Sequence, residues 1–430
     1  MRTLVSKYWA MPLLNRLFVG GAWAFFGSSF SRLLALVTAV VIARLLGVEN
    51  FGKLVILQST LSMFGVLAGL GVGVVATKFI AELKIRDAER LGKILSLLKW
   101  AVVIAGLVIG ICLALSANLV AEKIIHKPSL EPLIVMISFS VFFLTVDGYN
   151  SSALVGFEAI KRSATGLIFA NLLALPLSII LTLNLGLTGA VGGIVLTSFF
   201  QCLTSSYLLR KTIRGYSIKQ QRFSLCEWRI LLHFALPALL GSAFVAPAYW
   251  VTQVLLINSP NGTVQMALLG VGLQWFQAIY FFPLAFGRVV LPIVTDQIAG
   301  GSHGNARSIL KYSIIANAII TIPIAILIIV MSKWIVQMYG IYDDNAWAVL
   351  SLLVFAAILS SICDPVGQVM HAKGKNWYGA AMNLGWAIVF IVGSYFCINF
   401  GAFGVALSLT LAYILHLIWV SAWVFSNLDR

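Results

Sequence analysis

Arg32 lies near the middle of a long apolar run, residues Phe18–Ala43. If the run is helical, the face of Arg32 is shared by four small residues, Gly21, Ser28, Ala35 and Ala39. An arginine at mid-bilayer depth costs about 2.5 kcal/mol or more, so this side chain should face protein or water. Because a planar guanidinium suits bidentate contact with phosphate, we expect an anionic ligand, with a buried structural ion pair as the alternative.

Three further charged residues fall within or near apolar runs. Arg288 lies late in its run and either anchors the helix at the cytoplasmic surface or joins Arg32 at a binding site. Asp147 and Asp364 occupy matching places in two other runs, each toward the same end. Each of these two carboxylates either forms the wall of a polar cleft or a proton site, or locks helices together through a lysine or arginine.

Aromatic and amide residues gather in two neighbouring runs. Amides hydrogen-bond to sugar hydroxyls and aromatic rings stack on sugar rings, whereas the structural alternative is helix packing. The candidates for substrate binding are Trp250, Gln253, Gln274 and Trp275.

The sequence contains no nucleophile triad, no cluster of metal-ligating residues and no phosphate-binding loop. We therefore expect neither an enzyme nor a bound cofactor or metal.

The composition identifies an integral membrane protein. The chain has 430 residues, of which 60% are hydrophobic and only 10% are charged. Apolar runs long enough to cross a bilayer number about twelve, which predicts an all-α polytopic fold. The predicted spans are Phe18–Ala43, Leu54–Ala76, Ile94–Ser116, Pro132–Val155, Ala164–Leu185, Ala190–Leu209, Ile230–Ile257, Ala267–Val290, Ile309–Met331, Ala346–Gly367, Tyr378–Asn399 and Ala402–Phe425.

The net charge of +15 reports orientation rather than an anionic partner. Most of the 29 lysines and arginines fall in alternate connections, on the side that also holds both termini. Under the positive-inside rule both termini are cytoplasmic, and the charge gives no reason to expect nucleic acid as a partner.

The chain has an internal duplication. Between predicted spans five and six stands Asn184-Leu-Gly-Leu-Thr-Gly-Ala, and between spans eleven and twelve stands Asn399-Phe-Gly-Ala-Phe-Gly-Val. The two segments lie 215 positions apart, half the chain length. We predict two parallel six-helix lobes, residues 1–215 and 216–430, around a central cavity.

Several segments resemble bacterial polysaccharide-transport proteins. They are Ala43-Arg-Leu-Leu-Gly-Val-Glu-Asn-Phe-Gly-Lys, Gly69-Leu-Gly-Val-Gly-Val-Val-Ala-Thr-Lys, the Asn184 segment, and His233-Phe-Ala-Leu-Pro-Ala-Leu-Leu after a basic loop. The chain is similar to the O-antigen flippase branch of the multidrug/oligosaccharidyl-lipid/polysaccharide exporter superfamily.

That resemblance implies a flippase of the bacterial inner membrane that moves an undecaprenyl-pyrophosphate-linked oligosaccharide across the lipid bilayer to the periplasmic leaflet. It implies a cavity lined by cationic residues, which Arg32 and Arg288 match, and a role in polysaccharide or lipopolysaccharide biosynthesis. A polysaccharide polymerase and a chain-length regulator are candidate partners.

Two alternatives stay open. A drug/cation antiporter of the same superfamily would rely on acidic residues such as Asp147 and Asp364 and would need Arg32 little. A membrane-bound glycan polymerase would need a sizeable loop outside the membrane to carry catalytic carboxylates, and the predicted connections are short.

Overall fold

The structure is a computed structural model that describes the backbone of residues 13–216, 218, 228, 244–299, 303–343, 345–372 and 376–427. Every regular element within these residues is a helix, as the sequence predicted. The first half contains α2 (Leu13–Gly69), α3 (Val72–Leu83), α4 (Ala88–Leu115), the π-helix η1 (Leu119–Ile124), the 3-10 helix η2 (Pro128–Leu130), α5 (Glu131–Gly156) and α6 (Ile160–Gly215). The second half contains α8 (Val245–Ile257), α9 (Gly262–Ala299), α10 (His303–Val330), α11 (Ser332–Met338), α12 (Ala346–Ala372), α13 (Asn376–Phe396), η4 (Ile398–Phe400) and α14 (Gly401–Asn427).

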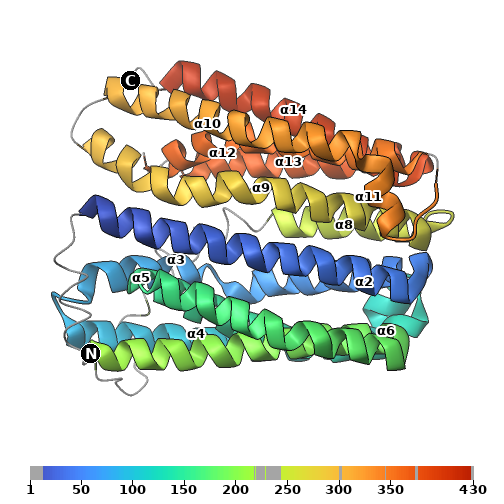
Figure 1. Ribbon diagram of the computed structural model, residues 1–430, viewed down its shortest axis with the longest axis horizontal. Helices are drawn as coiled ribbons and strands as arrows, with labels where there is room; N and C mark the ends of the chain where they lie inside the picture. Colours follow the sequence, from blue (N-terminus) through green and yellow to red (C-terminus); the bar gives the residue numbers. More distant parts are fainter. Residues whose placement is uncertain are drawn as a thin grey trace.

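The two halves form two lobes that lie side by side, with α2 facing α8 and α9 across the middle (Figure 1). The helices of both lobes run roughly parallel to one common direction, as expected for helices that cross a bilayer. The predicted boundary between residues 215 and 216 falls at the end of α6, beside residues that the structure does not describe, so it stays a prediction.

Glycine turns explain how the long helices match the predicted spans. Within the described residues, nine helices are long and apolar enough to cross a membrane. Two of them, α2 and α6, each hold two spans, because Gly47 (φ 70°, ψ 168°) and Gly186 (φ 55°, ψ −130°) leave the helical region and turn the chain back. With the short apolar helix α8 added, the architecture corresponds to about twelve spans.

The predicted continuous span Leu54–Ala76 is wrong in one respect. The helix breaks at Leu70 and Gly71, which have φ values of 47° and 65°, and α3 begins after them. The glycines of this segment differ in what they permit. A Cβ on Gly73 would lie 2.7 Å from the hydroxyl of Ser152, whereas one on Gly69 would meet nothing within 4 Å. One glycine permits close packing and another permits a left-handed turn.

Backbone geometry supports the duplication. Gly401, the counterpart of Gly186, has φ 58° and ψ −137°, close to the values at Gly186. Three residues further on, Gly189 and Gly404 are matched as well, since a Cβ on either would lie 1.9 Å from a backbone carbonyl oxygen of the preceding span. Both junctions therefore use one glycine for a positive φ and a second for close backbone approach.

Among the described residues, the buried core that the lobes share is centred on one end. The largest apolar cluster includes Leu46 and Phe51 beside the turn of α2, and Ile257 and Tyr339 of the second lobe. Two smaller clusters each stay within one lobe, around Ile80 in the first and around Val369 in the second. We call the end with the shared core, which holds Gly47, η1, α11 and the end of α8, the closed end.

Candidate substrate cleft

A cavity of about 400 Å³ lies between the lobes. Arg32 is the one charged side chain among the described residues that line it. The other polar lining residues are Gln58, Ser59 and Ser62 of α2, Gln253 of α8, and Gln274 and Gln277 of α9. A lining of one cation and several amides and hydroxyls suits a ligand with one anionic group and many hydroxyl groups.

Arg32 contacts the opposite lobe across this cavity. Its Nη1 donates to the backbone carbonyl oxygen of Gln277 at 3.4 Å, and its guanidinium carbon lies 5.2 Å from the centroid of the Phe281 ring. Both partners belong to α9, whereas Arg32 belongs to α2. The side chain is half-buried at the cavity wall, as the cost of placing a charge in lipid requires. The fork of N–H donors therefore stands where a polar ligand between the lobes would lie.

Gln253 is the amide of this cavity with the clearest unmet hydrogen bond. The residue is only 5% exposed, and its Oε1 has no hydrogen-bond partner among the described residues. Leaving a buried carbonyl oxygen without a donor costs about 1–3 kcal/mol. A ligand hydroxyl or a water molecule in the cavity would supply that donor.

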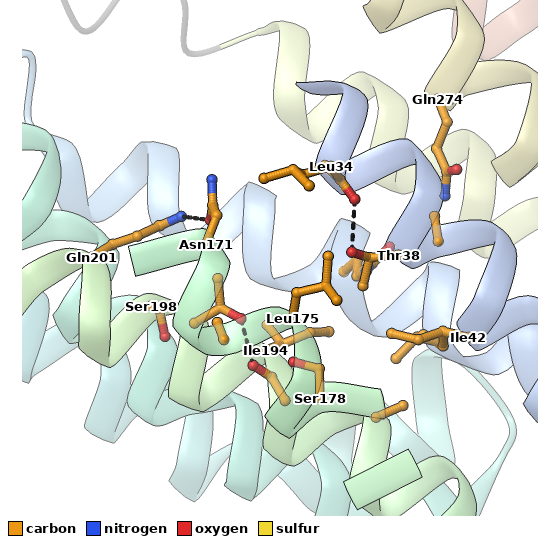
Figure 2. Close-up of a pocket in the computed structure, with 18 of the residues that line it drawn as sticks. Leu34, Thr38, Ile42, Asn171, Leu175, Ser178, Ile194, Ser198, Gln201 and Gln274 are labelled. Atoms are coloured by element: carbon orange, nitrogen blue, oxygen red, sulfur yellow. Dashed lines mark hydrogen bonds between the residues drawn. The ribbon is translucent and has the colours of Figure 1, made fainter. Parts of the chain in front are cut away.

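A second cavity, of about 260 Å³, adjoins the first and extends into the first lobe between α2 and α6. The two cavities share Ala35, Ala39, Gln58 and Gln274. Figure 2 shows Thr38 and Gln274 on one side of this space and Asn171 and Gln201 on the other. We call these two neighbouring cavities together the cleft, which extends from Arg32 into the first lobe.

The tryptophans of the predicted aromatic and amide cluster lie apart from its glutamines. Trp250 donates from its indole Nε1 to the hydroxyl of Thr60 at 3.0 Å, which joins α8 to α2. Trp275 packs against the shared apolar core. Gln253 and Gln274 line the cleft, and Gln274 also accepts a hydrogen bond from the hydroxyl of Tyr339 at 3.1 Å. In this structure the two tryptophans make packing contacts and the two glutamines line the cleft, while a role of all four in substrate binding stays a prediction.

Asp147 lies at a different cavity, of about 780 Å³, within the first lobe. Ser151, Ser205 and Lys78 line this cavity together with Asp147. Gln201 lines both this cavity and the one in Figure 2, which makes the two spaces neighbours. Asp147 therefore contributes to a polar wall beside the cleft and away from Arg32.

Asp364 lies in the second lobe, where the hydroxyl of Tyr280 donates to its Oδ1 at 3.0 Å. This hydrogen bond joins α9 to α12, so it packs two helices of one lobe together. Asp147 and Asp364 occupy matching positions in the sequence, but their surroundings in the structure differ. Arg288 falls on α9, but its side chain lies outside the described residues.

Sequence reasoning missed several polar residues of the cleft. They are Thr38, Gln58, Ser59, Ser62, Asn171, Thr197, Ser198 and Gln201. A usable signal was present for three of them, because amides are expensive in apolar helices and Gln58, Asn171 and Gln201 each stand in a predicted span. That Asn171 and Gln201 lie side by side becomes visible only once the spans pack together.

The fold is that of a known class of membrane transporter. A solved inward-facing MATE family transporter of the MOP superfamily superposes with a TM-score of 0.73 at 15% identity, covering 93% of this chain and 95% of the other. A MOP superfamily transporter from Pyrococcus furiosus superposes with a TM-score of 0.68 at 15% identity, covering 97% of this chain and 96% of the other.

Sequence comparison places the chain within one family of that class. The family model described as polysaccharide biosynthesis protein matches residues 17–297, and the MatE model matches residues 237–396. This chain belongs to the polysaccharide biosynthesis protein family.

Named relatives agree with this assignment. The EPS I polysaccharide export inner membrane protein EpsE of Ralstonia solanacearum is 27% identical over 191 residues, which is 44% of this chain and 43% of that protein. The matched part thus spans less than half of that relative. The lipopolysaccharide biosynthesis protein WzxC of Escherichia coli K12 is 23% identical over 95% of this chain and 80% of its own length.

Proposed function

We propose that this protein is a flippase that moves undecaprenyl-pyrophosphate-linked O-antigen or related polysaccharide repeat units from the cytoplasmic to the periplasmic leaflet of the bacterial inner membrane. The observation that carries the proposal is the cleft, which Arg32 lines together with several amides and hydroxyls from both lobes. The printed descriptions of EpsE and WzxC, polysaccharide export and lipopolysaccharide biosynthesis, support the substrate class.

The physical need for such a cleft follows from the chemistry of sugars. Each hydroxyl moved into hydrocarbon without a partner costs roughly 2 kcal/mol or more, so an oligosaccharide rarely crosses a bilayer unaided. A cleft lined by Gln58, Gln253 and Gln274 supplies hydrogen bonds in place of water. The polyprenyl tail stays in lipid and follows the headgroup between the lobes.

Arg32 supplies the matching contact for the pyrophosphate. A guanidinium binds phosphate oxygens through two parallel N–H donors, and this contact is strong inside an apolar protein. The negative charge of the pyrophosphate also gives transport a direction. Two negative charges moving outward gain roughly 4 to 5 kcal/mol for each 100 mV of inside-negative potential.

The orientation inferred from the basic connections sets the direction of access. With both termini in the cytoplasm, the turn at Gly47 faces the periplasm, and so does the whole closed end. Among the described residues, the shared core is then centred on the periplasmic side, and the two clusters that each stay within one lobe lie on the cytoplasmic side. This arrangement corresponds to a state that receives substrate from the cytoplasm, and transport requires the closed end to open as the lobes rock.

The test is export in a strain that lacks the gene. Loss of the protein should make a lipid-linked repeat unit accumulate in the cytoplasmic leaflet, and the wild-type gene should restore export. Arg32→Glu should fail to restore export, and Arg32→Lys, which keeps the charge, should restore part of it. Normal export by Arg32→Glu at wild-type protein level would refute the pyrophosphate contact.

A drug/cation antiporter is the second candidate, favoured by the MatE match over residues 237–396. In that case the carboxylates Asp147 and Asp364 carry the coupling, so Asp147→Asn or Asp364→Asn should change the pH or ion dependence of transport. An unchanged pH profile with a lower protein level assigns these carboxylates a structural role. A glycan polymerase would reveal itself by sugar polymerisation with the purified protein alone.

A further inference from the structure

We infer that the cavity of Figure 2 holds one uncharged sugar residue of the transported glycan and discriminates against acidic sugars. This inference rests on the proposed function and deepens it. We call the cavity the amide pocket. Its polar lining residues are Thr38 and Gln58 of α2, Asn171, Ser178, Thr197, Ser198 and Gln201 of α6, and Gln274 of α9. No lysine, arginine or histidine stands among the described residues that line it.

Three hydroxyls of the amide pocket already use their protons. Thr38 donates to the carbonyl oxygen of Leu34 at 2.7 Å, Thr197 to that of Gly193 at 2.7 Å, and Ser198 to that of Val195 at 2.8 Å. Each hydroxyl oxygen then has only lone pairs to offer a ligand. Sugar hydroxyls can donate to these acceptors. An ionised carboxylate only accepts, so the same oxygens repel it.

The amides complete the pattern for a ligand that both donates and accepts. Gln201 donates from Nε2 to Oδ1 of Asn171 at 3.1 Å, which orients this pair and leaves the NH₂ group of Asn171 to donate (Figure 2). The carbonyl of Gln274 accepts from Tyr339 at 3.1 Å, and the amide nitrogen of Gln274 is drawn on the side of Thr38 (Figure 2). A sugar hydroxyl is both donor and acceptor. It can accept from the NH₂ group of an amide and donate to one of the three hydroxyl oxygens whose own protons are already used.

The size and the apolar wall of the pocket suit one ring. Its volume of about 260 Å³ is just below the roughly 300–1,000 Å³ typical of pockets for drug-sized ligands. Leu34, Ile42, Leu175 and Ile194 supply apolar surface. The C–H face of a sugar ring can pack on this surface while its hydroxyls reach the polar groups.

The position of the amide pocket along α2 indicates which sugar of the glycan it holds. Thr38 stands six residues after Arg32, about 9 Å along the helix axis. If Arg32 holds the pyrophosphate, the sugar in the amide pocket is one close to the pyrophosphate end.

The test compares three defined probes on the purified full-length protein. They are a polyprenyl diphosphate without sugar, one that carries N-acetylglucosamine, and one that carries glucuronic acid, with affinities measured by microscale thermophoresis. We expect the N-acetylglucosamine probe to bind about tenfold more tightly than the glucuronic acid probe. Thr197→Val and Thr38→Val, which remove an acceptor at almost constant volume, should each weaken binding of the N-acetylglucosamine probe about three- to tenfold.

Thr165→Val is the matched control. Its hydroxyl also donates within its own helix, to Arg162 at 3.0 Å, but it does not line the amide pocket. This variant should bind all three probes as the wild type does. Equal affinity for the two sugar probes, or tighter binding of glucuronic acid, would overturn the inference and leave the flippase proposal intact. If no polyprenyl diphosphate binds, with or without sugar, both are wrong.

Discussion

Arg44 of the first lobe hydrogen-bonds to the backbone of Met338 in the second lobe. Nε of Arg44 donates to the backbone carbonyl oxygen of Met338 at 2.7 Å, and Nη2 donates to that of Gln337 at 2.9 Å. Both carbonyls belong to the last turn of α11, where the end of a helix carries partial negative charge. The Gln337 carbonyl also accepts from the backbone N–H of Gly340 at 2.9 Å. Arg44 therefore binds this helix end and joins the two lobes at the closed end in one contact.

Arg44→Ala should shift the protein toward the state in which the closed end is open. The change removes two charge-assisted hydrogen bonds, and because Arg44 is exposed we expect a shift of only about 1 kcal/mol. Spin labels at the exposed positions Glu49 and Lys333, in a background without the native cysteines, report the distance across this end by electron paramagnetic resonance. The longer distances should become more populated.

Lys53→Ala is the control for this prediction. The ammonium of Lys53 lies at the same end but bonds to the side chain of Asn50, 3.3 Å away in its own helix. Its removal should leave the distance distribution unchanged. An identical distribution for Arg44→Ala and the wild type would show that the contact does not bias the two states.

Trp250→Phe tests whether this tryptophan belongs to the packing or to the sugar site. The substitution keeps an aromatic ring but removes the hydrogen bond to Thr60, and Thr60 is fully buried. We expect a loss of about 1 kcal/mol in stability, measured as a lower midpoint of thermal unfolding in detergent. Binding of the polyprenyl diphosphate probes should stay within twofold of wild type. A large loss of probe binding without a matching loss of stability would instead show that Trp250 contacts the substrate.

The sequence predicted features that depend on local pattern. Apolar runs gave the helices, and the repeated Asn-x-Gly segments led to two junctions whose glycines, Gly186 and Gly401, share one unusual backbone geometry. Such features need only the order of residues along the chain. Arg32 was also found in this way, because a charge in an apolar run is conspicuous without any knowledge of its neighbours.

The cleft lining depends on packing between distant segments, which the sequence did not supply. Gln201 and Asn171 hydrogen-bond across the turn of α6, and Gln58 and Gln274 line one cavity from opposite lobes. The different surroundings of Asp147 and Asp364 have the same origin. Matching positions in a duplicated chain acquire different neighbours once each lobe packs its own side chains.

Gly186→Ala should destabilise the protein through backbone strain alone. A Cβ at this position would meet nothing within 4 Å, yet the φ of 55° and ψ of −130° are conformations that residues other than glycine rarely adopt. We expect a loss of about 1–3 kcal/mol, seen as a lower unfolding midpoint. Gly401→Ala should reduce the free energy of unfolding further, because its Cβ would also lie 2.5 Å from the side chain of Gln265. Gly65→Ala, with free space and no positive φ, should be neutral or slightly stabilising.

Glu158→Gln should destabilise the first lobe more than the exposed position of Glu158 suggests. Its carboxylate lies 2.6 Å from the ammonium of Lys84, whose side chain is only 4% exposed. Without this partner the buried ammonium keeps the carbonyl oxygen of Gly156 at 3.4 Å, a long contact for a full charge. We expect a loss of about 1–2 kcal/mol, smaller than for a fully buried pair because Glu158 itself is 53% exposed to solvent.

The double variant Lys84→Met with Glu158→Gln separates the loss of a contact from the burial of an unpaired charge. If the unpaired ammonium causes the destabilisation, its replacement by an apolar side chain of similar length should recover much of the unfolding midpoint. The exposed pair of Lys93 and Glu89, at 3.0 Å on α4, provides the comparison. Glu89→Gln should change stability by less than about 0.5 kcal/mol, because water solvates the remaining lysine. If the double variant instead loses as much stability as the two single variants added together, each side chain stabilises the protein through its own separate contacts.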